Sequence, residues 1–207
     1  MSGRAKKMWR IGLTGSIATG KSTVLRAFAE HGAKVFSADD AVHALYAGPA
    51  VPAVTALFPG VAPNGQIDRG LLSAELAKAP HRLAELEAEV HPMVRREIAA
   101  FMDGAQAEGA LIAVVEVPLL FESGFDYGFD AIGVTVCDPE EQKRRALERP
   151  GMTVEKLNAI LARQLPQADK KSRATYLFDT SGTRAQTEAM VKALVAAIQA
   201  REAQQQQ

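Results

Sequence analysis

An eight-residue run near the amino terminus constrains this chain more than any other feature. Residues 15–22 are Gly-Ser-Ile-Ala-Thr-Gly-Lys-Ser, which fits the pattern G-x-x-x-x-G-K-[ST]. The run follows a short apolar segment at residues 8–14 and opens a segment with helical apolar spacing at Val24, Leu25 and Phe28. The pattern folds around a phosphate group in this strand-loop-helix setting, so we favour that interpretation over a chance glycine-rich turn.

The residue types in this run predict how it would hold a nucleotide. Glycine lets backbone N–H groups turn toward a phosphate, and the helix that follows directs its positive dipole end at the same anion. Lys21 is then expected to reach the β- and γ-phosphates, and the Ser22 hydroxyl to ligate Mg²⁺. The sequence therefore predicts a nucleotide site with Mg²⁺ as its cofactor.

Strand-like and helix-like segments alternate along the rest of the chain. Five apolar runs have the length of strands: residues 8–14, 34–38, 110–117, 131–137 and 175–179. Apolar residues at three- and four-residue steps between Leu83 and Phe101 indicate one long amphipathic helix. The alternation predicts a doubly wound α/β fold with a five-stranded parallel sheet, into which a strand-free helical stretch at 49–108 is inserted. At 207 residues, the chain is long enough for such a core plus an insertion, since one domain takes about 150 residues.

Two acidic residues directly follow the strand expected at 34–38. Asp39 and Asp40 would lie at the carboxyl edge of the sheet, where ligands bind in open α/β folds. Either residue could be the N-cap of a short helix expected at 41–46, which needs one cap and leaves one acid spare. We favour Asp39 as the functional residue, a base or orienter for an attacking hydroxyl that also assists Mg²⁺.

Glu116 is a charged residue near the end of the apolar run at 110–117. A charge inside a buried strand is costly unless it is paired or bound to a metal. Glu116 is therefore a candidate for the acid that holds Mg²⁺ through water. The alternative interpretation is an outward or edge-facing side chain.

The charges of the chain balance, but they are unevenly distributed. Lys and Arg number 24, as do Asp and Glu, and this neutrality argues against a dedicated nucleic-acid binder. Residues 143–173, in contrast, contain nine basic residues and three acids. A solvated helical face would explain such a run. The single cysteine, Cys137, excludes an internal disulfide, and no apolar run is long enough for a membrane span, so we expect a cytoplasmic protein.

The basic run also has a functional interpretation. Gln142, Arg145 and Arg149 have the spacing of one helix face, and Pro150-Gly151 follows as a hinge between two expected helices. Cationic side chains on a hinged helical pair resemble a lid that closes on a triphosphate. Such a lid excludes water and stabilises charge on the transferring phosphoryl group.

Several motifs beyond the phosphate-binding run carry a family resemblance. In chain order they are Ile11-Gly12-Leu13-Thr14-Gly15-Ser16, Ser37-Ala38-Asp39 with His43, His91-Pro92 with Arg95, Glu116-Val117-Pro118-Leu119-Leu120-Phe121-Glu122, Gln142-x-x-Arg145-x-x-x-Arg149, Gln164 and Asp179-Thr180-Ser181-Gly182. With these motifs the chain resembles the dephospho-CoA kinase family, which is related to the nucleoside monophosphate kinases. The resemblance spans nearly all of residues 10–182.

The resemblance implies a fold, a reaction and a division into parts. The fold would be that of the P-loop NTPases, with a helical CoA-binding insertion and a helical lid. The reaction would transfer the γ-phosphoryl group of ATP to the ribose 3′-hydroxyl of dephospho-CoA, the last step of coenzyme A biosynthesis. The implied parts are a nucleotide-binding core at 9–48, 109–140 and 174–201, an acceptor (CoA) domain at 49–108, a lid at 141–173 and a disordered tail at 202–207.

Carried over by position, the resemblance also implies site residues. The catalytic residues would be Asp39, Lys21 and Arg145, and the metal ligands Ser22 and Asp39. The nucleotide-binding residues would be Ala18, Thr19, Gly20, Lys21, Ser22, Thr23 and Arg149. The acceptor-binding residues would be His43, His91 and Glu116. For His91, a capping or core role just before Pro92 is the alternative interpretation.

The chain departs from the family pattern at several positions. Ser37 and Glu116 stand where Asp is usual, Thr180 stands where Asn is common, and Thr175 stands where Asp is common. Ala18 and Thr19 replace small residues that are often Gly and Ser. Lys21, Ser22, Asp39 and Arg145 are all retained.

The sequence disfavours three other classes of protein. A degenerate scaffold that no longer binds nucleotide does not agree with the intact Gly20-Lys21-Ser22. Another small-molecule kinase of the same architecture is disfavoured by the 49–108 insertion and by the string at 117–122. A slowly hydrolysing nucleotide switch is disfavoured because no Asn-Lys-x-Asp segment is present and because the expected lid is rich in arginine. The expected partners are thus ATP and dephospho-CoA, without nucleic acid or membrane, for a monomer or small homo-oligomer.

Overall fold

The computed structural model describes residues 7–204 of the chain. Five strands are present in this part: β1 (Trp9–Gly15), β2 (Lys34–Ser37), β3 (Ile112–Glu116), β4 (Ala131–Val136) and β5 (Tyr176–Asp179). The helices are α1 (Lys21–Glu30), α2 (Ala38–Tyr46), α3 (Val51–Leu57), α4 (Arg69–Lys78), the short 3₁₀ helix η1 (Pro80–Arg82), α5 (Leu83–Ala107), α6 (Pro139–Leu147), α7 (Val154–Leu161), α8 (Gln167–Ser172) and α9 (Arg184–Gln204).

The five strands form one sheet in the order β2-β3-β1-β4-β5. β1 runs parallel to β3 and to β4, and β5 runs parallel to β4. The chain first builds the sheet to one side of β1 and then crosses to the other side, so β1 lies at the point where the strand order reverses. Ligands bind outside the carboxyl ends of strands at such a point. The predicted doubly wound parallel sheet is confirmed.

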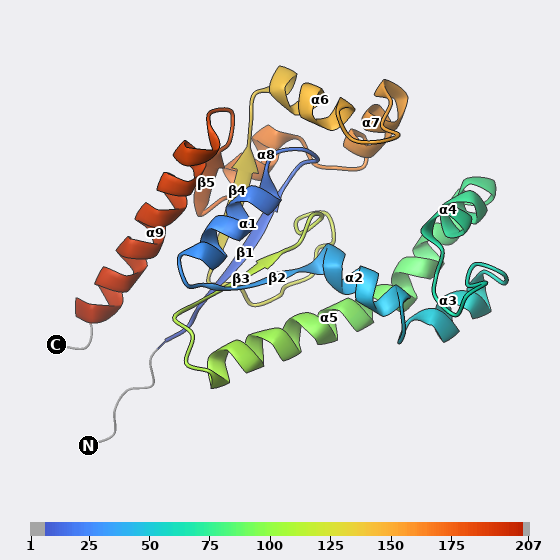
Figure 1. The fold of residues 1–207 in the computed structure, drawn as a ribbon, viewed down its shortest axis with the longest axis horizontal. Coiled ribbons are helices and arrows are strands. Elements are labelled where there is room, and N and C mark those ends of the chain that lie inside the picture. Colours follow the sequence, from blue (N-terminus) through green and yellow to red (C-terminus); the bar gives the residue numbers. More distant parts are fainter. Residues whose placement is uncertain (1–6, 205–207) are drawn as a thin grey trace. The chain divides into compact units, whose positions relative to one another are not determined.

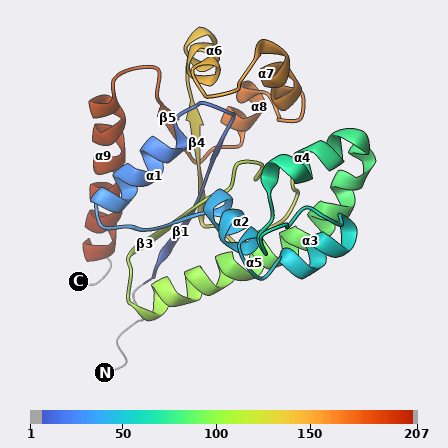
Figure 2. The same ribbon diagram turned by 45° about the vertical axis from the view of Figure 1, so that its right-hand side comes forward.

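One face of the sheet is packed against two helices that lie side by side, α1 and α9 (Figures 1 and 2). Ile11 and Leu13 of β1 are fully buried here against Phe28 of α1 and Val191 of α9. The ring of Phe28 meets the ring of Phe178 edge to face, with 5.8 Å between the ring centroids. This apolar layer fixes the position of β1 and α1, and therefore of the loop that joins them.

The chain divides into two compact units. The core unit contains residues 7–36 and 104–204, and the helical unit contains residues 37–103. The helical unit begins earlier than the insertion expected at 49–108, because it also contains α2. The N–H of Ile67 donates to the carbonyl of Tyr46, and the N–H of Ala50 donates to that of Leu45, so backbone hydrogen bonds connect the end of α2 to later parts of this unit.

The last helix continues into the segment 202–207, for which the sequence predicts a disordered tail. α9 extends to Gln204, so residues 202–204 are helical, while 205–207 lie outside the described residues. Glu202 is buried, and its Oε1 accepts a hydrogen bond of 3.1 Å from Nε1 of Trp9. The two residues are 193 positions apart, so local sequence could not indicate this contact.

Replacing Glu202 with Leu is expected to lower the free energy of unfolding by about 1–3 kcal/mol, because the buried Trp9 N–H loses its acceptor. Glu202→Gln keeps an acceptor oxygen and should retain most of the stability. Gln199→Leu, at an exposed position of the same helix, is the matched control. Denaturant unfolding measures all three, and equal stability of the Glu202→Leu and Gln199→Leu variants would contradict the assignment.

Candidate functional site

The loop between β1 and α1 has glycine at the two positions where a side chain cannot fit. Gly15 ends β1, and a Cβ atom there would collide with the side chain of Thr135 in β4. Gly20 precedes α1 with φ of 82°, and a Cβ atom there would lie 3.0 Å from Oγ1 of Thr180. Both glycines of the G-x-x-x-x-G-K-S pattern are therefore required by the fold of the loop itself.

Ala18 and Thr19 occupy the loop in different ways. Ala18 has φ of 60°, and it is the one residue other than glycine with positive φ among those described. Glycine would adopt this left-handed backbone with less strain than alanine does. Thr19 is fully buried, and its hydroxyl donates to the carbonyl of Ser16 and also contacts the hydroxyl of Thr135 at 2.7 Å. Its side chain thus helps to hold the loop.

Lys21 and Ser22 lie in the first turn of α1, beside the loop. Nζ of Lys21 donates to the carbonyls of Gly15 and Ser16, each at 3.2 Å. The ammonium group is thereby folded over the loop in which a phosphate would bind. Ser22 is exposed, so its hydroxyl is accessible to a ligand at the positive end of the helix.

Arg145 projects from α6 toward the segment after β5. Its Nε donates to Glu141 Oε1 at 2.7 Å, its Nη1 to Thr180 Oγ1 at 3.1 Å and its Nη2 to the Thr180 carbonyl at 2.7 Å. Oγ1 of Thr180 in turn donates to the carbonyl of Thr19. Thr19 belongs to the loop between β1 and α1, which we call the phosphate-binding loop (residues 15–22). Arg145 therefore contacts the loop indirectly, through Thr180.

Arg149 does not share the helix face of Gln142 and Arg145. α6 ends at Leu147, so Arg149 lies in the turn that follows and is exposed. The prediction that Gln142, Arg145 and Arg149 share one helix face is therefore wrong for Arg149. Gln142 is buried, in contrast to the exposed Arg149.

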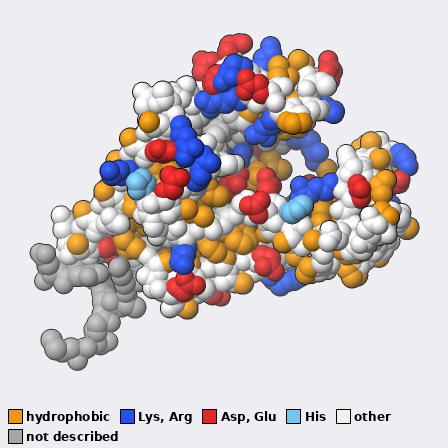
Figure 3. Space-filling view, in the orientation of Figure 1, with side chains coloured by type: hydrophobic (Ala, Val, Ile, Leu, Met, Phe, Trp, Pro, Cys, Tyr) orange, Lys and Arg blue, Asp and Glu red, His pale blue; other side chains and the backbone are white. Residues whose placement is uncertain are grey.

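Basic and acidic side chains gather together over α6 and α7 (Figure 3). Arg144 on α6 pairs with both Glu141 and Glu148. The hydrogen-bonded Arg144 guanidinium, with a further contribution from Arg145, lowers the pKa of the Glu141 carboxyl to about 2. Arg144 is thus part of a surface ion-pair cluster, in agreement with the interpretation of the basic run as a solvated face.

Lys170 of the same basic run is fully buried instead. Its Nζ lies 2.8 Å from Oε1 of Glu122, which also accepts a hydrogen bond from the N–H of Leu165 at 2.8 Å. Burial raises the pKa of the Glu122 carboxyl, but the nearby Lys170 ammonium and the hydrogen bond from Leu165 outweigh it, and the pKa lies below its ordinary value. The basic run therefore combines exposed charges with one buried ion pair.

Glu116 is the last residue of β3 and is 5% exposed. β3 is flanked by β2 and β1, so the interpretation of Glu116 as an edge-facing side chain is wrong. Alternation along the strand places Glu116 on the same face as Ile112 and Val114, which belong to the core cluster beneath α1. A carboxyl group therefore lies at the carboxyl end of β3, on the face of the sheet that α1 covers.

Asp39 and Asp40 lie in the first turn of α2, in the helical unit. The N-cap of this helix is Ser37, whose side chain accepts from the N–H of Asp40 at 3.3 Å. The expectation that one of the two acids caps the helix is therefore wrong, because α2 begins three residues before the predicted helix at 41–46. Both carboxyl groups are exposed. His43 is also exposed and lies four residues after Asp39, on the same helix face.

His91 lies in the middle of α5 in the helical unit, and it is exposed. It is neither a cap nor a core residue, so both alternative interpretations are wrong. The following Pro92 lies inside the helix. His91 therefore presents an imidazole to solvent from the interior of a long helix.

Residues 7–204 contain no cluster of three or more His, Cys, Asp or Glu side chains that could hold a metal ion without other ligands. Mg²⁺ commonly binds through one or two protein oxygens together with substrate phosphates, so the Ser22 hydroxyl and single carboxylates fit this ion. Across the same residues, the helices lack the combination of length and apolar character that a membrane crossing requires.

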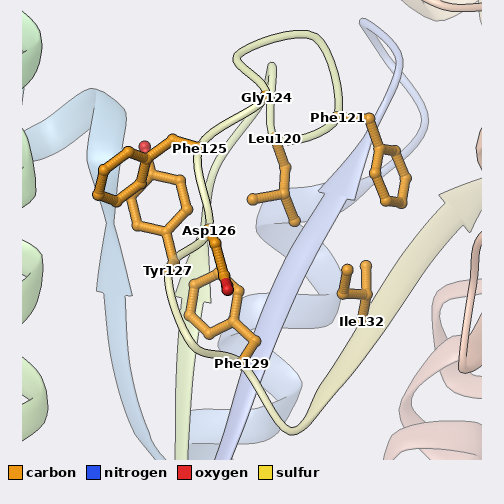
Figure 4. A pocket seen from close by; sticks show the side chains of 8 residues that line it. All are labelled: Leu120, Phe121, Gly124, Phe125, Asp126, Tyr127, Phe129 and Ile132. Atoms are coloured by element: carbon orange, nitrogen blue, oxygen red, sulfur yellow. The ribbon is translucent and has the colours of Figure 1, made fainter.

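A cavity of about 250 Å³ lies beside the segment that joins β3 to β4. Its lining is mostly apolar, with Phe125, Tyr127 and Phe129 in contact as a row of aromatic rings (Figure 4). Phe129 lies against Gly12 of β1, where any side chain would collide with it. Such a lining suits an apolar group and not a triphosphate.

Three residues of the sequence motifs contact or support the phosphate-binding loop, although the sequence predicted no role at the loop for any of them. Gln142 and Gln164 form hydrogen bonds to the backbone of Ile17, and Glu122 holds the chain beside Gln164. Two features of the sequence could have indicated such a role. Gln142 is a polar residue on the inner face of α6, and Glu122 is a carboxylate that ends the apolar string at 117–122. Neither signal indicates which distant backbone group is the partner.

Known proteins resemble this chain over most of its length. A family model described as dephospho-CoA kinase matches residues 9–186. A dephospho-CoA kinase from Rhizobium meliloti (strain 1021) is 49% identical over 185 residues, which cover 89% of this chain and 95% of that protein. A crystal structure from Thermus thermophilus has a TM-score of 0.77 at 33% identity and covers 93% of this chain and 98% of the other. A dephospho-CoA kinase from Campylobacter jejuni shares the fold, with a TM-score of 0.65 at 22% identity, over 91% of this chain and 96% of that chain.

Proposed function

This chain belongs to the dephospho-CoA kinase family, and we propose that it transfers the γ-phosphoryl group of ATP to the ribose 3′-hydroxyl of dephospho-CoA. The products would be coenzyme A and ADP, and the reaction would complete coenzyme A biosynthesis. The observation that carries the proposal is the loop between β1 and α1. It is built for a phosphate group, and it lies at the strand-order reversal of a sheet that matches this family.

The phosphate-binding loop would hold the ATP phosphates from residues 18–23. Lys21 would leave the carbonyls of Gly15 and Ser16 and reach the β- and γ-phosphates, where its charge balances theirs. Mg²⁺ would bind to the Ser22 hydroxyl and the phosphates, and when bound it neutralises negative charge on the phosphoryl oxygens. Its donors are hard oxygens, which this ion prefers.

The helical unit would supply the acceptor side of the reaction. Asp39 would accept the proton of the attacking 3′-hydroxyl or orient that hydroxyl, with assistance to Mg²⁺. The position of Ser37 as the helix cap supports this role, because the carboxyl group of Asp39 is not engaged in capping. The exposed imidazoles of His43 and His91 would contact dephospho-CoA.

Glu116 has two possible roles, an acceptor-binding role and a Mg²⁺-binding role through water. Its place on the face of β3 that α1 covers supports the second, since Ser22 lies in the first turn of α1. A buried carboxylate is stabilised by a nearby cation, which would lower the cost of its burial.

Residues 141–173 would form the lid over the triphosphate. Arg145 would contact the transferring phosphoryl group, and the exposed Arg149 would bind ATP. The balance of 24 basic and 24 acidic residues argues against nucleic acid as a partner. We place this reaction in the cytoplasm, without a membrane partner, in a monomer or small homo-oligomer.

One set of incubations tests the proposed reaction. The protein is mixed with ATP and Mg²⁺ and with dephospho-CoA, a panel of nucleoside monophosphates or no acceptor, and the products are separated by chromatography. Coenzyme A formed only with dephospho-CoA supports the proposal. Equal release of ADP in every mixture would identify a nucleotide hydrolase or switch instead.

Arg145→Ala is expected to lower kcat roughly tenfold, because the transferring phosphoryl group loses a charge-assisted hydrogen bond. The KM for dephospho-CoA should change less. Arg144→Ala is the matched control, since Arg144 lies on the same helix and pairs with the same Glu141 but is 57% exposed. Steady-state kinetics with both substrates varied measures the effect, and a change confined to the acceptor KM would place Arg145 on dephospho-CoA.

A further inference from the structure

The N–H, the carbonyl and the side chain of Ile17, near the middle of the phosphate-binding loop, are all contacted by residues within 142–164. Its N–H donates to Oε1 of Gln164 at 3.0 Å, and its carbonyl accepts from Nε2 of Gln142 at 2.8 Å. Its side chain is buried in an apolar cluster with Ala146 of α6 and Leu157 of α7. Both polar groups of this loop residue are therefore committed to glutamine side chains and not to a phosphate.

These two hydrogen bonds determine the direction of the neighbouring peptide groups. In a planar trans peptide the C=O and N–H point in opposite directions. The hydrogen bond from Gln142 to the Ile17 carbonyl therefore orients the N–H of Ala18 away from Gln142. In the same way, the hydrogen bond from Ile17 N–H to Gln164 orients the Ser16 carbonyl to the other side, where Lys21 Nζ and Thr19 Oγ1 contact it.

Each glutamine is itself held in place by further contacts. Gln142 is 7% exposed, and its Oε1 accepts from Nε2 of Gln167 at 2.9 Å. Gln167 also pairs with both backbone groups of Cys137, directly after β4. These contacts tie Gln142 to the sheet as well as to the loop.

Gln164 is held through its neighbour in the chain. The N–H of Leu165 donates to Oε1 of Glu122, and the same oxygen pairs with the fully buried Lys170. Glu122 ends the string at 117–122 and has no other assigned role. The buried ion pair thus fixes the backbone beside Gln164, and through it the acceptor of the Ile17 N–H.

We propose that Gln142 and Gln164 are positioning residues for phosphoryl transfer, which orient the peptide groups on either side of Ile17 so that the loop is preformed for ATP. Glu122 and Lys170 act behind Gln164 as its anchor. The inference rests on the proposed function, since it assigns the preformed loop to ATP binding. Neither glutamine contacts the substrate in this scheme, so both act through Ile17.

The two glutamines differ in the group that they use. Gln164 provides an acceptor oxygen to an N–H, and Gln142 provides a donor nitrogen to a carbonyl. Glutamate in place of Gln164 keeps the acceptor, but glutamate in place of Gln142 loses the donor and places a carboxylate against a carbonyl. We therefore expect that substitution by glutamate is tolerated at Gln164 and disrupts the loop at Gln142.

Amide hydrogen exchange of the ATP-free protein tests the inference independently of activity. In Gln164→Met, the Ile17 amide is expected to exchange about tenfold faster than in wild type, because its acceptor is lost. Gln164→Glu should restore slow exchange, while Gln142→Glu should leave the loop amides at least as unprotected as Gln142→Met. Val195→Ala, in the α9 core, is the control for a general loss of stability. Unchanged Ile17 exchange in Gln164→Met, or equal acceleration in Val195→Ala, would overturn the proposal.

Kinetics with the same variants give the second readout. Gln142→Met is expected to raise the KM for ATP about tenfold, with little change in the KM for dephospho-CoA, because a misoriented loop loses a phosphate contact. An increase confined to the dephospho-CoA KM would overturn the positioning role. If wild type makes no coenzyme A, the proposed function fails while the exchange result for Ile17 still stands, so the two failures are distinguishable.

Discussion

Asp39→Asn is expected to lower the rate of coenzyme A formation by roughly 10²–10⁴, while the affinity for ATP stays nearly unchanged. Asparagine preserves the size and polarity of the side chain but cannot accept a proton from the attacking hydroxyl. Turnover is measured as coenzyme A formed at saturating substrates, and ATP affinity by calorimetry without the acceptor. A fall in turnover at constant ATP affinity would place Asp39 in the chemical step.

Asp40→Asn is the matched control for this experiment. Both acids lie in the first turn of α2 and both are exposed, while Ser37 caps the helix, so neither substitution removes the cap. Each variant also removes one negative charge from the same helix end, which makes their effects on α2 similar. If Asp39→Asn kept turnover within a factor of a few, or if Asp40→Asn lost as much, the assignment of Asp39 would be contradicted.

The parts of the fold that sequence predicts well depend on local pattern. The phosphate-binding loop is specified by two glycines that the fold requires and by the Lys-Ser pair that follows, all within eight residues. The five strands are specified by short apolar runs, and all five are present. Helices between most strands predict the crossover connections of a parallel sheet, whereas β3 and β4 are joined by a segment without a helix.

The parts that sequence could not predict depend on contacts between distant segments. Lys170 belongs by composition to a solvated basic run, but Glu122, 48 residues earlier in the sequence, draws it into a buried pair. Gln142 meets Ile17 across 125 positions, and no periodic pattern signals a side chain that pairs with a backbone group. The end of α6 at Leu147 is a different case, because Pro150 disfavours a helical conformation at Arg149 and this local signal was not used.

The site shows the same division between local and distant information. Arg145 of the proposed lid was predicted from helical spacing, but its partner Thr180 lies 35 positions away, on the segment after β5. Thr180 contacts both Arg145 and the Thr19 carbonyl, so it links α6 to the phosphate-binding loop. Such a link depends on the strand order β1-β4-β5, which the sequence pattern does not specify.

Lys21→Met is expected to lower kcat/KM for ATP by about 10³, because a preorganised positive charge is lost where negative charge develops on the phosphoryl oxygens. Methionine has a similar length and preserves helix propensity, so α1 should remain intact. The carbonyls of Gly15 and Ser16 lose their contact with Nζ, but the loop keeps its hydrogen bonds to the glutamine side chains at Ile17. Lys143→Met, at an exposed position on α6, removes the same charge away from the loop and should leave kcat/KM nearly unchanged. Comparable losses in the two variants would mean that net charge alone attracts ATP, and would contradict a specific phosphate contact of Lys21.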